Sequence, residues 1–161
     1  MGKKVVDDLE KHSIEAIKKH IVSLSNSESF NDAKVEWELY KVELCDIWYR
    51  CPCNHPIKEL CHIKNRLNSN KTYVGNVCIY KFMDIKTDNI FSGIKRISQD
   101  IYANVNKDLI EYLRYNKHLS PNEYRFLLQT KRKRKLSAKQ YAWKKIINKK
   151  ILYFSGIKES S

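Results

Sequence analysis

The chain has 161 residues, 42% of them hydrophobic, and 31 Lys and Arg against 18 Asp and Glu give it a formal net charge of +13. This length suits one domain, or a small module joined to a helical segment. No apolar run approaches the roughly 18 residues of a membrane-spanning helix, and the first residues lack the apolar stretch of a secretion signal. We therefore expect an intracellular protein that does not enter membranes and keeps its cysteines reduced.

An amphipathic helix is predicted near the N-terminus, from about Val5 to Leu24. Its apolar residues recur at spacings of three and four, with lysines on the opposite face: Ile14, Ile17, Ile21 and Leu24. The serine-rich run from Ser23 to Ser29 predicts a loop. Asn31 or Asp32 is then expected to cap a short helical turn that precedes Trp37.

The middle of the chain predicts strands. Apolar and polar residues alternate from Tyr40 to Cys45, which is typical of a strand with one buried face. The β-prone segments Leu60–Ile63 and Thr72–Val74 flank the turn formers Asn68–Asn70, so they predict a hairpin. The segment Cys78–Met83 then predicts the first turn of a helix.

Everything after Asp88 has the periodicity of helices. One apolar stripe consists of Ile90, Ile94, Ile97 and Ile101, and a second consists of Leu109 and Leu113. Two capping boxes of the pattern Leu-Ser-x-x-Glu/Gln-Tyr begin at Leu119 and Leu136, 17 residues apart, and the first has proline at the first helical position. They predict two similar helices with a basic segment between them.

Four of the five cysteines lie within 28 residues, in a stretch rich in turn formers, with Gly75 placed where a flexible backbone is useful. Thiolates are the preferred ligands of structural zinc, and four of them close a tetrahedral site. The predicted zinc ligands are Cys51, Cys53, Cys61 and Cys78. His55 is the alternative to Cys61, and Cys45 is expected to be an ordinary packed or exposed thiol. The competing interpretation is a set of small buried thiols without metal.

The cysteine region also resembles a known family. The resemblance rests on Glu36-Trp37, Cys51–Lys58, Cys61–Asn65, Val74–Ile79 and Phe82-Met83. These segments are similar to small, uncharacterised proteins of bacteriophages and large DNA viruses that share a Cys-x-Cys…Cys…Val-Gly-x-x-Cys core. The resemblance implies a zinc-binding module and a viral origin, and it implies no activity. Asn54 stands where glycine is frequent in that pattern, a departure that affects the turn more than the ligands.

Positive charge is concentrated near the C-terminus, where ten Lys and Arg and no Asp or Glu lie between Lys131 and Lys150. Such asymmetry indicates a polyanionic partner, most commonly nucleic acid, although a solvated surface is the simpler alternative. The predicted phosphate-binding residues are Lys131, Arg132, Lys133, Arg134, Lys135, Lys139, Lys144 and Lys145. Tyr141 and Trp143 either stack on bases or, as we favour, belong to a core.

These elements predict an α+β protein in three parts: an N-terminal helix and loop (1–30), a treble-clef-like zinc-binding β-hairpin module (31–87) and a basic helical bundle (88–161). The predicted function is that of a non-catalytic, zinc-containing accessory factor of viral replication or transcription that binds DNA or RNA with weak sequence preference. Its expected location is the host cytoplasm, or the nucleus of a eukaryotic host.

Two other functions remain open from the sequence. One is a virus-encoded inhibitor that binds a host protein. The other is a metal-dependent nuclease that uses His55 or His62 with Asn65 or Asn68. No paired set of His or carboxylates and no phosphate-binding loop accompanies these residues, so we expect no catalysis.

Overall fold

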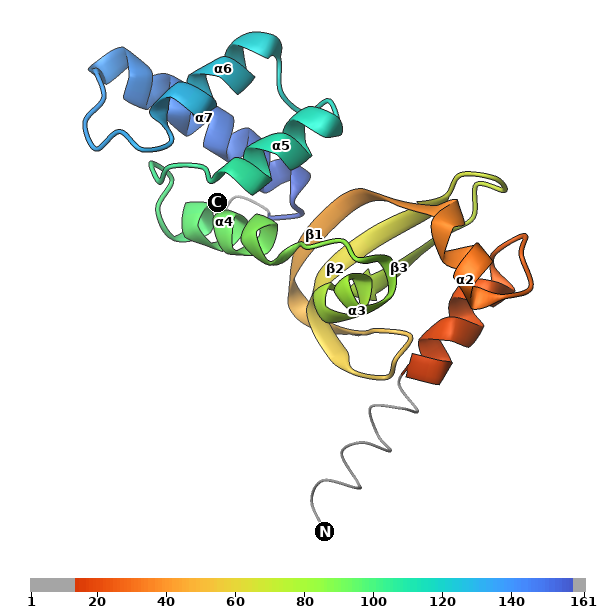
Figure 1. Cartoon of the computed structure of the whole chain (residues 1–161). Helices are drawn as coiled ribbons and strands as arrows, with labels where there is room; N and C mark the ends of the chain where they lie inside the picture. Colours follow the sequence, from red (N-terminus) through yellow and green to blue (C-terminus); the bar gives the residue numbers. More distant parts are fainter. Residues whose placement is uncertain (1–13, 158–161) are drawn as a thin grey trace. The chain divides into compact units, whose positions relative to one another are not determined.

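The computed structural model describes residues 14–157 and shows an α+β protein with one three-stranded antiparallel sheet. The chain divides into two compact units, the first ending at Lys86 and the second beginning at Thr87 (Figure 1). Among the described helices, none has both the length and the apolar character that crossing a bilayer requires.

The first unit opens with the predicted helix, which the structure shows over residues 14–23; the part from Val5 to Ser13 lies outside the described residues. Its buried face carries Ile17 and Ile21, and a loop follows as expected. The short helix α2 (Phe30–Ala33) begins after Ser29, whose hydroxyl accepts a hydrogen bond from the Asp32 amide. The expectation that Asn31 or Asp32 caps this turn is therefore wrong, because both lie inside the helix.

A 3₁₀ turn, η1 (Lys34–Glu36), leads into the strands β1 (Trp37–Arg50), β2 (Pro56–Asn65) and β3 (Lys71–Gly75). Their order is β1-β2-β3, and β2 with β3 forms the predicted hairpin. The pairing of β1 with β2 shifts twice, between Leu39 and Lys41 and between Leu44 and Tyr49. Such irregularities bend a strand and change which side its side chains face.

Helix α3 (Asn76–Met83) follows β3 directly and contacts β2 and β3, as Figure 1 shows. The core of the first unit lies between one face of the sheet, α3 and the helix over residues 14–23. Its fully or almost fully buried apolar side chains come from all of these elements: Ile17, Ile21, Val42, Ile63, Val74 and Ile79. Burial of this face fixes the register of the sheet, since a slip of one residue would turn the apolar side chains outward.

Residues 87–157, the described part of the second unit, form four helices: α4 (Asp88–Gln99), α5 (Lys107–Tyr115), α6 (Pro121–Thr130) and α7 (Ala138–Phe154). Both predicted capping boxes are present, at Ser120 with Glu123 and at Ser137 with Gln140. The predicted stripe of isoleucines is buried along α4, but Ile101 lies beyond the end of that helix. Helices α4 and α5 both carry buried apolar faces, so this unit has its own core.

Candidate metal centre and nucleic-acid interface

The turn between β1 and β2 holds two of the cysteines in a tight knuckle. The Asn54 amide donates to the Cys51 carbonyl over 2.8 Å, and the Cys51 amide donates to the His55 carbonyl over 2.9 Å. Asn54 has a φ of 74°, in the left-handed region that glycine adopts freely and asparagine tolerates best among the other residues. Asparagine in place of glycine at position 54 therefore preserves the conformation of the turn.

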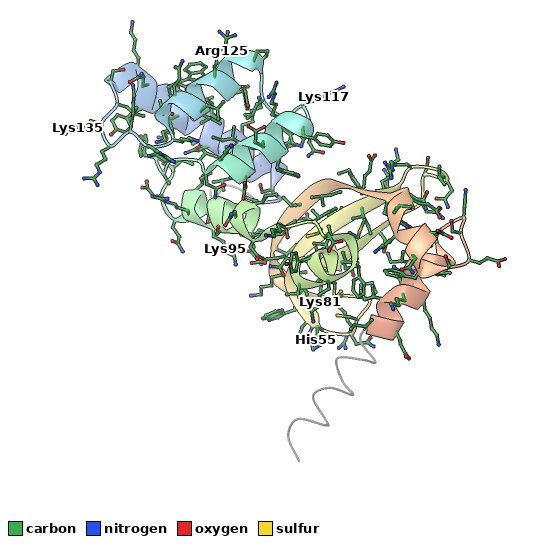
Figure 2. All side chains as sticks on the ribbon, viewed as in Figure 1. His55, Lys81, Lys95, Lys117, Arg125 and Lys135 are labelled. Carbon is green, nitrogen blue, oxygen red and sulfur yellow. The ribbon has the colours of Figure 1, made fainter. Side chains whose placement is uncertain are left out.

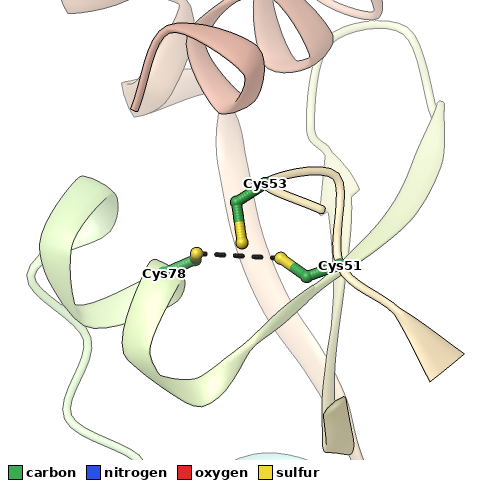
Figure 3. Close-up of side chains that lie close together, drawn as sticks. All are labelled: Cys51, Cys53 and Cys78. Atoms are coloured by element: carbon green, nitrogen blue, oxygen red, sulfur yellow. Dashed lines mark hydrogen bonds between the residues drawn. The ribbon is translucent and has the colours of Figure 1, made fainter. Parts of the chain in front are cut away.

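Three sulfur atoms converge at this knuckle (Figure 3). Cys51 and Cys53 come from the turn and Cys78 from the first turn of α3, and their Sγ atoms all lie within 4.8 Å of one another. The Sγ atoms of Cys51 and Cys78 are 3.7 Å apart. Two thiolates on one tetrahedral zinc, with Zn–S bonds of about 2.3 Å, stand about 3.8 Å apart. The spacing thus fits two ligands of a shared metal ion.

Hydrogen bonds favour the thiolate form of Cys51. The hydrogen bond shared with Cys78 and those from the amides of Cys53 and Gly75 lower the pKa of Cys51 to about 6, against the opposing effect of burial. The Gly75 amide lies 3.4 Å from this sulfur. The same hydrogen bond to Cys51, together with burial, raises the pKa of Cys78, and burial raises that of Cys53. A thiolate held by amide donors is the form that binds metal.

Gly75 has a role that sequence reasoning missed. Its φ of −73° is accessible to any residue, so backbone flexibility is not what this position requires. A Cβ atom here would stand 3.0 Å from the Cγ2 atom of Ile57, and the absence of a side chain allows β3 to approach the chain that follows the knuckle. The signal in the sequence was a glycine two residues after a β-prone tyrosine and three before a cysteine.

Cys61 does not belong to the group of sulfurs that the described residues bring together. It lies in the middle of β2, opposite Val42 on β1 and Val74 on β3, and is fully buried. The predicted four-thiolate set is thus reduced to three. His55, the predicted alternative, is exposed at the end of the knuckle, and its backbone amide donates to Cys53. Cys45 is half-buried, and burial raises its pKa.

The basic segment forms the loop between α6 and α7, where Arg132, Lys133, Arg134 and Lys135 are exposed and Lys131 is half-buried. Figure 2 shows Lys135 projecting from this loop. Two side chains fix its backbone: Asn104 donates to the Lys133 carbonyl over 3.1 Å and Tyr141 to the Arg134 carbonyl over 3.4 Å. Within residues 14–157, no carboxylate forms an ion pair with these four cations.

Lys139, Lys144 and Lys145 are expected to extend this basic surface along α7, and Lys144 does not reach it. Lys144 is 2% exposed, and its ammonium donates to the amide oxygen of Asn104, so the prediction that it contacts phosphate is wrong. Lys139 is exposed, and Lys145 is half-buried with its ammonium 6.0 Å from the centre of the Tyr102 ring. Lys144 is more buried than Lys139 and Lys145 because it lies on the same face of α7 as the buried Ile147 and Ile151.

The aromatic residues near the loop pack against other rings. Trp143 stacks on Phe126 with ring centres 4.4 Å apart, and Tyr141 meets the edge of Tyr102 at 5.9 Å. Tyr141 is half-buried, and Trp143 keeps 36% of its surface exposed.

Three of the four residues proposed for a nuclease, His62, Asn65 and Asn68, have hydrogen-bonded side chains, whereas His55 is exposed. His62 pairs with Glu43 at 3.0 Å. The Asn65 side chain accepts from the amides of Leu67 and Asn68, which closes the turn between β2 and β3.

Comparison with protein-family models, curated proteins and solved structures finds no significant match. The site is therefore interpreted from its own geometry.

Proposed function

We propose that the chain binds one structural Zn²⁺ through Cys51, Cys53 and Cys78, and that it binds nucleic acid without cleaving it. The convergence of three sulfur atoms, two of them 3.7 Å apart, carries the first part. The exposed basic loop carries the second. The resemblance of the cysteine region to viral proteins implies a viral origin but no activity, and nucleic-acid binding by a viral protein would serve replication or transcription.

His55 is the fourth ligand in this proposal. Its ring nitrogens do not belong to the group that the three sulfurs form, so binding requires this exposed side chain to rotate toward them. It follows Cys53 by two residues, and imidazole is a common zinc ligand beside cysteine. Three thiolates and one imidazole would close the coordination sphere and leave no position for a reacting water. The ion then ties the knuckle to the start of α3, and its role is to stabilise the first unit. Thiolates are soft ligands, which favour zinc over Mg²⁺ or Ca²⁺.

Metal analysis tests the first part. We expect one zinc per chain in protein purified without chelator, measured by elemental analysis, and loss of that zinc in Cys78→Ser. His55→Ala should bind zinc more weakly, whereas the matched control Cys45→Ser should keep a full equivalent. Less than half an equivalent in the parent protein, or an unchanged content in Cys78→Ser, would contradict the metal site.

The charge distribution supports nucleic acid as the partner. Residues 87–161 contain 17 of the 31 Lys and Arg but only 6 of the 18 Asp and Glu. Four consecutive exposed cations repel one another, and phosphates would neutralise them with release of bound counterions. The loop offers no obvious set of side chains for reading bases, so its contacts are expected to be to the backbone, with weak sequence preference.

The salt dependence of binding tests the second part. If about four phosphate contacts form on duplex DNA, log affinity should fall against log salt with a slope of about −3.6. Replacement of Arg132, Lys133 and Arg134 by alanine should flatten the slope and weaken binding to all sequences alike. The control replaces Lys81 and Lys86, which are exposed in the first unit, and should change the slope less. An unchanged slope in the triple variant would refute the assignment, and tight binding to a host protein without nucleic-acid binding would favour the inhibitor.

A further inference from the structure

A chain of aromatic rings crosses the face of the sheet that is turned away from the core. The ring centres of Tyr49 and Tyr73 are 6.2 Å apart, those of Tyr73 and His62 are 6.0 Å apart, and those of His62 and Tyr40 are 6.1 Å apart. His62 and Tyr73 are direct partners in the sheet, next to the inward-facing pair of Cys61 and Val74. Since side chains alternate along a strand, the rings share the opposite face.

Exposed apolar and cationic groups continue this surface. Trp48 is 66% exposed and Ile47 is 64% exposed, and both lie between Leu44 and Tyr49, where the pairing of β1 with β2 is irregular and strict alternation does not apply. Trp48 is assigned to this face through Lys58, which lies an even number of residues from His62 along β2. The Lys58 ammonium lies 4.7 Å from the Trp48 ring centre, and the Lys71 ammonium lies 5.4 Å from that of Tyr40. We call Trp48, Tyr49, Tyr73, Lys58 and Lys71 the aromatic face.

We propose that the aromatic face binds single-stranded nucleic acid, with bases stacked on Trp48, Tyr49 and Tyr73 and phosphates near Lys58 and Lys71. Stacking on exposed rings requires bases that are not already stacked in a duplex, which single strands supply. A partner with an apolar protein surface would bury the two ammonium groups without compensation, whereas a phosphate backbone neutralises them. Glu43 also lies on this side of the sheet, but its carboxylate is paired with His62.

This inference rests on the proposed nucleic-acid binding and adds the strandedness of the ligand. It also separates two contributions. The basic loop would supply salt-dependent affinity for any nucleic acid. The rings of the aromatic face would supply affinity for single strands that depends little on salt, because base stacking releases few counterions, while Lys58 and Lys71 would add their own salt-dependent contacts.

The decisive measurement is the affinity of Trp48→Leu and Tyr49→Leu for a fluorescein-labelled oligothymidylate of about 10 nucleotides and for a duplex of the same length. We expect each substitution to weaken oligothymidylate binding by about 5- to 150-fold, with an unchanged salt slope and unchanged duplex affinity. Trp48→Phe should retain most of the affinity because it keeps an aromatic ring. The matched control is Tyr153→Leu, which removes a ring 77% exposed on α7 and should change nothing.

Tryptophan fluorescence provides a second readout. Trp37 is buried, and Trp143 is stacked on Phe126 and 36% exposed, against 66% for Trp48. Trp48 should therefore give most of the quenching caused by oligothymidylate, and Trp48→Phe should lose that part of the quenching while still binding; Trp143→Phe is the control that should retain it. Equal affinity of the parent and both leucine variants for oligothymidylate would refute the aromatic face while leaving the basic loop intact. If the parent binds neither single strands nor duplex, both proposals are wrong. If the leucine variants lose duplex binding to the same extent, preference for single strands is wrong.

Discussion

Glu36 joins three segments of the first unit through one carboxylate. It accepts hydrogen bonds from the backbone amides of Asn26 and Ser27 and from the side-chain amide of Asn65, over 2.8 to 3.0 Å. The hydrogen bond from Asn65, helped by those from Asn26 and Ser27, lowers the pKa of Glu36 to about 2, against the opposing effect of burial. Asn65 in turn closes the β2–β3 turn, so this carboxylate holds the loop after the first helix against the hairpin.

The pH dependence of folding should report this carboxylate. Its pKa is lower in the folded chain than the ordinary 4.5, so the stabilisation is complete above pH 4.5 and is lost as pH falls toward 2. We expect Glu36→Gln to remove that part of the pH dependence. The measurement is the urea midpoint of both proteins between pH 2 and 6; protonation of the thiols affects both, so their difference isolates Glu36. A constant difference across this range would contradict the assignment.

At the scale of elements, the basic loop is held by α7 and by the segment between α4 and α5, which contains Asn104. Lys144 on α7 donates to Asn104, and Asn104 donates to the Lys133 carbonyl. The buried Lys144 therefore helps to fix the backbone of the loop at the exposed Lys133. Burial lowers the pKa of Lys144. The capping box at Ser137 then starts α7 directly after the loop, which limits how far its cations can move.

Lys144 and Lys139 should therefore respond differently to substitution. Lys139→Ala removes an exposed cation and should flatten the salt slope by about 0.9, the value expected for one phosphate contact. Lys144→Met removes a buried cation and should leave the slope unchanged. Binding titrations on duplex DNA over a salt series compare the two variants directly; a flatter slope for Lys144→Met would show that this side chain reaches phosphate after all.

For the whole molecule, the two units differ in charge and in their proposed dependence on metal. The sulfur group lies entirely in the first unit, while the second unit has a core of its own and most of the excess positive charge. Metal binding to a site absent from the unfolded chain contributes directly to folding. The first unit alone should therefore respond to loss of the ion.

Chelation should separate the units. After addition of a strong zinc chelator, we expect faster amide hydrogen exchange in β2, β3 and α3, with protection in α5 and α7 retained. Exchange measured by mass spectrometry on peptides from both units gives the comparison, and Cys78→Ser should reproduce the chelated pattern. Loss of protection in α7 together with β2 would indicate one cooperative molecule instead of two units.

Much of the local structure could be predicted from the sequence because its causes act over a few residues. The capping boxes at Ser120 and Ser137 satisfy amides three residues away, and the alternation on either side of Asn68–Asn70 defines a hairpin wherever the rest of the chain lies. The α+β class and the helix over residues 14–23 follow from the same periodicities. The cap of α2 was misassigned because serine and aspartate are both good caps and only the backbone shows which residue precedes the helix.

Only the tertiary structure decided which side chains meet. Cys61 is close in sequence to the other cysteines, but its position opposite Val42 and Val74 places it in the core, since a single residue of register determines the face of a strand. The same applies to Lys144, whose face on α7 is set by packing around Ile147 and Ile151. The aromatic face is assembled from three strands, so no spacing along the chain contains it. Sequence thus determined the elements, and pairing and packing determined which residues came together.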